Sequence, residues 1–269
     1  MPSTSTRLPT DDELSDVAWY HTIELPDGRL TPGRWDTVAI VDRVGLPASL
    51  EGKRCLDIGS CDGFWAFELE RRGAAQVVAT DVDDPTQLDW PASVPVDARP
   101  SEEGRARTTF GLAAAALGSS VERIDLSVYD LSPERIGTFD FVFMGNLLLH
   151  LRDPIRALES VRSVTGDLFL SNDSFNPTLS ILRPRKPAAW LDADGRWRWW
   201  TVNLAGRRRM IEAAGFEIVW AGRPYILPWG PAGPAPALPR PGRIRRGLLE
   251  QFYGRVGAPN APMLCRPAV

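Results

Sequence analysis

One β-α-β unit constrains the fold of this chain more than any other feature. Residues 53–84 read KRCLDIGSCDGFWAFELERRGAAQVVATDVDD, in which a first apolar strand runs through Asp57 and a second strand, Gln76–Thr80, leads to Asp81. A tight loop with Gly59 and Gly63, followed by an amphipathic helix, joins the two strands. Strands that alternate with helices predict a doubly wound sheet, and such sheets bind ligands beyond the carboxyl ends of their strands.

The residue types in this unit indicate a cationic ligand that contains a ribose. Gly59 and Gly63 allow a ligand to approach the main chain, and Asp81 stands about 20 residues later, where a carboxylate accepts the hydrogen bonds of a ribose diol. A dinucleotide site has the pattern G-x-G-x-x-G, whereas this loop reads G-S-C-D-G and lies between Asp57 and the helix. Asp57 and Asp62 would repel a pyrophosphate but suit the sulfonium and ammonium of S-adenosylmethionine (SAM). The alternative is a Rossmann-like unit that binds no SAM.

The composition gives the class of protein but little about partners. The chain has 269 residues, of which 43% are apolar, enough for one large domain or a domain with a lid. Three cysteines without paired spacing predict a reduced, cytoplasmic protein without disulfides. Two histidines and no C-x-x-C pattern argue against structural zinc. The polar N-terminus is unlike a signal peptide, and no membrane association is expected.

The remaining periodic segments predict alternating helices and strands. Further strands are expected at Val121–Val128, Phe139–Met144, Asp167–Leu170, Phe216–Ala221 and Pro262–Arg266, the last antiparallel to its predecessor. Helices are expected at Asp11–Asp16, Asp36–Val44, Glu102–Leu117, Asp153–Val164 and Leu204–Ala214. Pro224–Arg243 is expected to be a long loop. We divide the chain into a disordered tail (1–10), an N-terminal helical cap (11–52) and a main domain (53–269) with an insertion at about 175–203.

A second motif narrows the comparison to a family. Gly137–Val161 reads GTFDFVFMGNLLLHLRDPIRALESV, and Trp19-Tyr20-His21 and Arg34-Trp35-Asp36 precede the β-α-β unit. Together these residues resemble the methyltransferases related to the bacterial tRNA wobble-uridine (5-oxyacetate) carboxymethyltransferase, densely over 53–161 and thinly elsewhere. The resemblance implies an α/β, Rossmann-like class I methyltransferase fold. It has a seven-stranded, mostly parallel sheet with helices on both faces, to which this chain adds an N-terminal helical lid and an aromatic, Pro-rich insertion.

The tRNA enzyme uses carboxy-SAM, and most of the groups that hold its extra carboxylate are missing here. His21 replaces a lysine, Leu149 replaces a tyrosine, and Asn260-Ala261-Pro262 offers no arginine, although Arg34 could keep one charge. A buried carboxylate without its partners costs roughly 2–5 kcal/mol. We therefore expect ordinary SAM as the cofactor and methyl transfer as the reaction.

The expected site draws on the ends of several strands. Val128 and Tyr129 occupy the adenine position of the family, and Gly145 and Asn146 follow the fourth strand. Tyr129 is alternatively a half-buried strand end, and the histidines are alternatively structural. The predicted cofactor residues are Asp57, Gly59, Ser60, Gly63, Asp81, Val82, Val128, Tyr129, Gly145 and Arg34; the predicted catalytic residues are His21 and His150; the predicted acceptor residues are Asn146, Trp199, Trp200 and Asn203.

No metal is expected at this site. Asn146, Asn172 and Asp173 faintly resemble the magnesium ligands of catechol-type methyltransferases, but the acid expected after the fourth strand is absent.

Three functions remain open at this point. The first is methyl transfer to a hydroxyl or amine of a small molecule, such as a secondary metabolite or a sugar. The second is tRNA modification, for which the arginines at 207–209 and 240–246 would contact phosphates; we expect these arginines to be solvated surface instead. The third is a SAM-binding partner subunit without activity. The sequence does not predict the oligomeric state.

Overall fold

A central sheet of eight strands organises the computed structural model, which describes residues 6–95, 105–192, 198–234 and 255–268. The strands of this sheet are β1 (Arg54–Ile58), β2 (Gln76–Asp81), β3 (Glu122–Asp125), β4 (Phe139–Gly145), β5 (Thr165–Ser174), β8 (Phe216–Ala221), β9 (Tyr225–Pro228) and β10 (Gly257–Pro267). Their order is β3-β2-β1-β4-β5-β10-β8, with β9 paired to β10. The first five are parallel, and β10 runs antiparallel to β5, β8 and β9. The predicted α/β class is confirmed.

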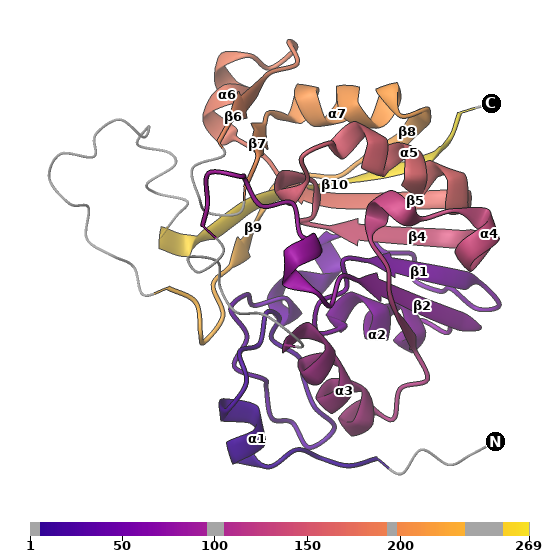
Figure 1. Ribbon diagram of the computed structural model, residues 1–269, viewed down its shortest axis with the longest axis vertical. Coiled ribbons are helices and arrows are strands. Elements are labelled where there is room, and N and C mark those ends of the chain that lie inside the picture. Colours follow the sequence, from indigo (N-terminus) through magenta and orange to yellow (C-terminus); the bar gives the residue numbers. More distant parts are fainter. Residues whose placement is uncertain (1–5, 96–104, 193–197, 235–254, 269) are drawn as a thin grey trace, which may run out of the picture.

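Helices cover both faces of the sheet (Figure 1). One face packs against α2 (Phe64–Arg71), α3 (Arg105–Leu117) and the N-terminal segment, and the other against α4 (Pro133–Ile136), α5 (Pro154–Val164) and α7 (Leu204–Ala213). Strand β4 shows why the arrangement is stable. Phe141 and Phe143 are buried in the first core, on the α2 and α3 face of the sheet, whereas Val142 and Met144 are buried in the second core, on the α4, α5 and α7 face. Because β4 is apolar on both faces, it requires a layer on each side.

The N-terminal segment packs directly on the first core. Helix α1 (Asp11–Ser15) begins at Thr10, whose side chain forms a capping box with Glu13. Trp19, Ile23 and Leu25 are buried with Phe143. The helix predicted at Asp36–Val44 is instead a 3-10 helix, η1 (Val38–Arg43). Trp35, just before η1, forms isolated bridges with His21 and Trp229, so the cap has less helix than the sequence predicts.

The predicted tail and domain boundaries are only partly described. Residues 1–5 lie outside the described residues, and the backbone N–H of Arg7 donates to the carbonyl of Ala115 at 3.1 Å. The division at residue 52 stays a prediction.

Strand β9 lies inside the predicted loop Pro224–Arg243. Tyr225 and Leu227 are buried, and the backbone of β9 pairs with β10. The segment therefore extends the sheet despite its Pro and Gly content. The rest of that loop, from residue 235, is outside the described residues.

Strand β3 is shorter than predicted. Ser127 caps a 3-10 turn, η4 (Val128–Asp130), which takes Val128 out of the strand.

The insertion after β5 also has regular structure. It contains helix α6 (Pro177–Leu182) and a hairpin of β6 (Ala189–Leu191) and β7 (Trp200–Val202). The alternation of this short hairpin was too brief to be distinguished from a loop in the sequence. In Figure 1 these elements project beyond α7 at one end of the molecule.

Arg207 corrects the prediction that residues 207–209 form a solvated basic patch. Its side chain is fully buried, with the guanidinium donating to the carbonyls of Asp173 and Ala261. Burial raises the pKa of Asp173, and the nearby positive charge of Arg207 partly offsets that rise. Arg208 and Arg209 are exposed on the same helix. Helix α7 packs against β8 and α5, and of its three arginines only Arg207 is buried, with its guanidinium at carbonyls of β5 and β10.

We predict that Arg207→Ala lowers the free energy of unfolding by about 3–5 kcal/mol, because it leaves two buried carbonyls without their donor and removes the positive charge near the buried Asp173. Arg208→Ala on the exposed side should change it by less than about 0.5 kcal/mol. Urea unfolding of both variants measures the difference, and equal values would contradict a structural role for Arg207.

Candidate cofactor and active site

The loop between β1 and α2 turns tightly over the ends of two strands. The N–H groups of Gly59 and Ser60 donate to the carbonyl of Thr80 at 2.8 and 3.1 Å. Gly63 has φ +89°, and a Cβ there would lie 2.6 Å from the ring of Phe67. Cys61, where many SAM enzymes have a glycine, also has a positive φ of 49°. The backbone of this loop is therefore held in a conformation that side chains rarely allow.

Three carboxylates surround this loop. Asp57 and Asp62 are 1% and 0% exposed, and Asp81 accepts from the N–H groups of Cys61 and Val82 at 2.6 and 2.8 Å. Burial, and then the charge of Asp81, raise the pKa of Asp57 to about 8. Asp57 is therefore held protonated below about pH 8, and a cation bound beside it would favour its charged form.

Unpaired polar atoms at the same loop fit a ligand with polar groups. Oδ2 of Asp57, Oγ of Ser60 and Oγ1 of Thr80 are buried without a hydrogen-bond partner in the described part of the chain. Buried polar atoms without partners are costly unless a ligand or water meets them. These carboxylate and hydroxyl oxygens suit the sulfonium, ammonium and ribose of SAM.

A cavity opens beside the loop at the carboxyl ends of β1, β2 and β4. Six predicted residues line it together: Gly59, Asp81, Val82, Val128, Tyr129 and His150. The cavity places the predicted ribose acid and the predicted adenine residues on one surface. The other lining residues are not among the predicted ones, because they are mostly apolar or lie outside motifs: Ile58, Gln87, Leu88, Asp89, Leu126, Ser127, Leu147 and Leu151.

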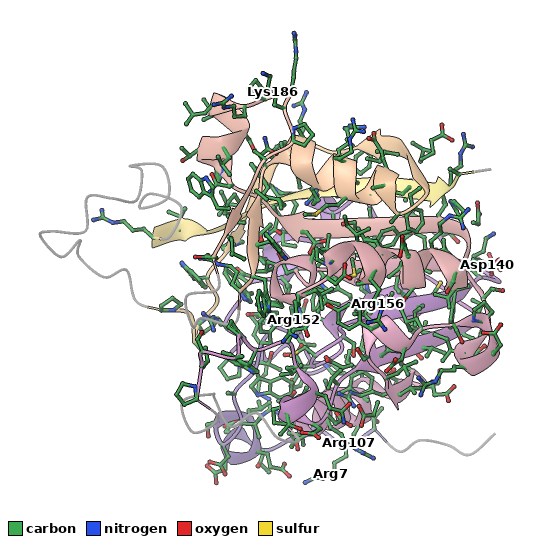
Figure 2. All side chains as sticks on the ribbon, turned by 45° about the horizontal axis from the view of Figure 1, so that its top comes forward. Arg7, Arg107, Asp140, Arg152, Arg156 and Lys186 are labelled. Atoms are coloured by element: carbon green, nitrogen blue, oxygen red, sulfur yellow. The ribbon has the colours of Figure 1, made fainter. Side chains whose placement is uncertain are left out.

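Asp89 closes one side of this cavity. Its Oδ2 accepts from the hydroxyl of Tyr129 at 2.5 Å and from the N–H of Arg152 at 2.8 Å, while its carbonyl accepts from Nε1 of Trp199 at 2.5 Å. Figure 2 shows Arg152 and Arg156 in this part of the molecule. Their guanidiniums lie 5.1 Å from the ring of Trp199 and 5.2 Å from that of Tyr129. We call these bonds of Asp89 the clasp.

Both predicted acceptor tryptophans form hydrogen bonds with backbone carbonyls of the fold. Trp199 bonds to Asp89 at the cofactor cavity, and Nε1 of Trp200 donates to the carbonyl of Arg152 at 3.1 Å. Asn203 caps α7: Oδ1 accepts from Gly206 at 2.7 Å, and Nδ2 donates to two carbonyls of the insertion. Because its polar atoms are engaged in the fold, Asn203 has a structural role here rather than one in binding the acceptor.

His21 and Asp62 form a buried pair on the other side of the glycine loop. Nδ1 of His21 contacts Oδ1 of Asp62, whose Oδ2 accepts from the N–H groups of Tyr20 and His21, both at 2.8 Å. His21 is 6% exposed and also lies near the ring of Phe64, at 5.7 Å between centroids. A carboxylate on Nδ1 fixes the tautomer that leaves Nε2 as an acceptor. In the described residues no hydrogen bond involves Nε2.

The predicted residues at the end of β4 meet β5. Gly145 pairs with Asn172, and the N–H of Asn146 donates to the carbonyl of Asn172 at 3.1 Å. Asn146 has φ +51°, an uncommon conformation for a residue other than glycine. Asn172 accepts from the hydroxyl of Tyr225 at 2.9 Å.

Asp173 holds the loop after β4 in place. Its Oδ1 accepts from the N–H groups of Leu147 and Leu148 at 3.0 and 3.2 Å. Two of the three residues of the faint metal pattern, Asn172 and Asp173, thus have side-chain hydrogen bonds within the fold.

Arg34 lies outside the cofactor cavity. Its guanidinium is exposed and sits 6.0 and 5.8 Å from the ring centroids of Trp35 and Trp229, which stack at 4.0 Å. The positive charge of Arg34, which stands where the tRNA enzymes have a lysine, therefore lies on an aromatic surface beside Tyr20. Its contact with the cofactor stays a prediction.

Comparison with protein families gives the identity of the fold and chemistry. A family model described as a methyltransferase domain matches residues 34–221, more than half of the chain. The chain belongs to this methyltransferase family. It is a SAM-dependent methyltransferase, with SAM as its cofactor.

Curated relatives of this chain include methyltransferases, which match a smaller part of it than the family model does. The ubiquinone biosynthesis O-methyltransferase of Xanthomonas campestris pv. campestris (strain B100) is 35% identical over 156 residues, 57% of this chain and 54% of that protein. The chain thus spans about half the length of the curated relatives it matches.

Solved structures share the fold of this methyltransferase. A Burkholderia thailandensis 1,6-didemethyltoxoflavin-N1-methyltransferase with bound S-adenosylhomocysteine matches with a TM-score of 0.50 and 13% identity, over 81% of this chain and 72% of that one. The cyclase SpnF matches with a TM-score of 0.50 and 17% identity, over 87% and 80%. Identities this low establish the fold alone.

We predict that SAM binding releases a proton near neutral pH. Below about pH 8 the folded protein carries a proton on Asp57, and a bound cation favours loss of that proton. Affinity for SAM should therefore rise as the pH rises from 6 to 8. Titration calorimetry in two buffers of different ionisation enthalpy counts the protons released. Asp57→Asn, which cannot titrate, is the control: unchanged proton release in this variant would contradict the assignment.

The sign for stability follows from the same pKa. Because the pKa of Asp57 is higher in the folded protein than in the unfolded chain, where it is near 3.8, the protein without cofactor loses stability as the pH rises between these values. Thermal unfolding across that range should show a smaller loss in Asp57→Asn.

We predict that Asp89→Ala weakens S-adenosylhomocysteine binding on the order of tenfold, because the variant removes two hydrogen bonds of the clasp. Asp130→Asn, an exposed acid in the turn next to Tyr129, is the matched control and should bind normally. Equal affinity in Asp89→Ala and the wild type would show that the clasp does not hold the cofactor.

Proposed function

We propose that this methyltransferase transfers a methyl group to a hydroxyl of a small molecule, such as a secondary metabolite or a sugar. The observation that supports this proposal is the buried pair of His21 and Asp62 beside the cofactor loop. A hydroxyl is a weak nucleophile until a base removes its proton, whereas a neutral amine needs no such base to attack. The pair therefore favours an oxygen acceptor over a nitrogen acceptor.

The pair has the parts of a general base with its orienting group. Asp62 holds Nδ1–H, so that Nε2 of His21 is free to accept the proton that the acceptor hydroxyl loses. Asp62 also stabilises the imidazolium that results, as a buried carboxylate does in other acid–base pairs. Bound SAM supplies an electrophilic methyl group on a sulfonium sulfur. The chain itself contributes orientation, proton transfer and a negative surface around the cation.

The partial match to an O-methyltransferase supports the same class of acceptor. That relative is named for ubiquinone biosynthesis, and the likeness covers little more than half of each chain. We infer the acceptor class, and a place in natural product biosynthesis, from this likeness and the His21–Asp62 pair together.

His150 offers a different role from His21. It lines the cofactor cavity together with Asp81 and Tyr129. We propose that His150 contributes to cofactor binding and that His21 is the base, so the two predicted catalytic histidines are distinguishable by kinetics.

The test measures methyl transfer from radiolabelled SAM to a panel of acceptors, for the wild type and for two histidine variants. The panel contains phenols, sugars and amines, with bulk tRNA as the alternative acceptor. We expect methylation of a hydroxyl compound. His21→Gln should lower kcat by about 10²–10⁴-fold, with the Kd for S-adenosylhomocysteine nearly unchanged, whereas His150→Gln should raise that Kd. Loss of rate in His150→Gln at normal affinity would move the base to His150.

The alternative is an enzyme related to the tRNA wobble-uridine carboxymethyltransferases. Methylation of tRNA in this panel, with binding that weakens steeply as salt rises, would replace the proposal by that alternative. Binding of SAM without methylation of any acceptor class would favour a partner subunit.

A further inference from the structure

The insertion after β5 presents an apolar tip to solvent. This tip, residues 181–191, spans the end of α6, a connector and β6. Its side chains include the three most exposed large apolar residues of the described chain, Leu182 (67%), Ile181 (66%) and Leu191 (63%), with Trp190 at 46%. Single exposed apolar residues are common, but four of them within eleven residues of one insertion point to an interaction surface.

The backbone of the tip is fixed by hydrogen bonds, so the exposure is a property of the fold. Nδ2 of Asn203 donates to the carbonyls of Arg183 and Lys186 at 2.8 and 2.9 Å, and its Oδ1 accepts from the N–H of Ala188 at 3.0 Å. Asn176 caps α6 by accepting from the N–H of Leu179 at 2.8 Å. The apolar side chains therefore stay outside because the anchored backbone directs them there.

The charge of the tip is opposite to that of the whole chain. Residues 174–191 contain Arg183, Arg185 and Lys186 and no acid, while the chain carries a net charge of −3. All three cations are exposed, and none forms an ion pair with a described residue. Figure 2 shows Lys186 at the far end of the molecule, pointing away from the body.

We propose that the tip docks on the surface of an anionic lipid membrane. Apolar side chains next to a tryptophan can enter the boundary between headgroups and acyl chains, and the cations beside them meet anionic headgroups. The described helices include none that is long and apolar enough to cross a membrane, so the contact is interfacial. A second copy of the chain is a poorer occupant, because two tips would bring like charges together.

The tip is also connected to the cofactor cavity. Strand β6 pairs with β7, which follows Trp199, and Trp199 donates to the carbonyl of Asp89 in the clasp. The tip and the clasp are therefore joined through β6 and β7. The proposal does not depend on which acceptor is methylated.

The test is co-sedimentation of the full chain with vesicles. One set contains phosphatidylcholine and phosphatidylglycerol, and the other contains phosphatidylcholine alone. We expect binding to the first set that weakens with salt, and little binding to the second. Replacing the three cations by glutamine (Arg183→Gln, Arg185→Gln, Lys186→Gln) should weaken binding on the order of a hundredfold at low salt, at about fivefold per cation. Ile181→Ser with Leu182→Ser should also weaken it at least tenfold.

Matched variants elsewhere on the surface give the controls. Leu30→Ser removes an apolar side chain that is 51% exposed, and Arg209→Gln removes an exposed cation; both should bind vesicles like the wild type. Absence of binding, equal binding to both vesicle types, or an equal loss in the controls would overturn the proposal. Sedimentation velocity adds a second readout: self-association that the Ile181→Ser, Leu182→Ser variant abolishes would assign the tip to a second copy instead.

Discussion

The carboxylate of Asp62 joins the two parts of the molecule on which the site depends. It belongs to the cofactor loop, and it accepts two backbone N–H groups and the imidazole of His21 from the N-terminal segment. Without those bonds, residues 20 and 21 would have no polar attachment to the loop, and a buried carboxylate would lack its partners, at a cost of several kcal/mol. One side chain thus sets both the position of the segment over the sheet and the tautomer of the histidine.

The charge of the site follows from the same loop. Asp57, Asp62 and Asp81 converge where β1 and β2 end, and the fold supplies no cation that pairs with Asp57 among the described residues. Negative charge held in this way lowers the stability of the protein without cofactor and raises its affinity for a cation. The buried Asp173 contrasts with it: the nearby charge of Arg207 favours its ionised form, and its carboxylate holds the loop that carries Leu147 and Leu148.

Local patterns predicted the elements that depend on local chemistry. The strands around Asp57 and Asp81, the glycine loop and β4 follow from residue types at fixed spacing, and the structure gathers Gly59, Asp81, Val82, Val128 and Tyr129 in one cavity. The sequence did not reveal what depends on distant contacts. Asp89 gains its role from Trp199, 110 positions away, and Arg207 is buried because its helix face meets β5 and β10. Strand β9 lay in a Pro- and Gly-rich stretch, where a partner strand overrides composition.

The charges around this site suit a cofactor that is a cation without an added carboxylate. Asp62 beside His21 places a negative charge where the tRNA enzymes have a lysine, and Arg34 lies on the stacked Trp35 and Trp229 rather than in the cavity. Side-by-side calorimetric titrations of the wild-type protein with SAM and with carboxy-SAM measure this preference. We expect SAM to bind at least as tightly as carboxy-SAM. A clear preference for carboxy-SAM would contradict it and return the enzyme to the tRNA-modifying group.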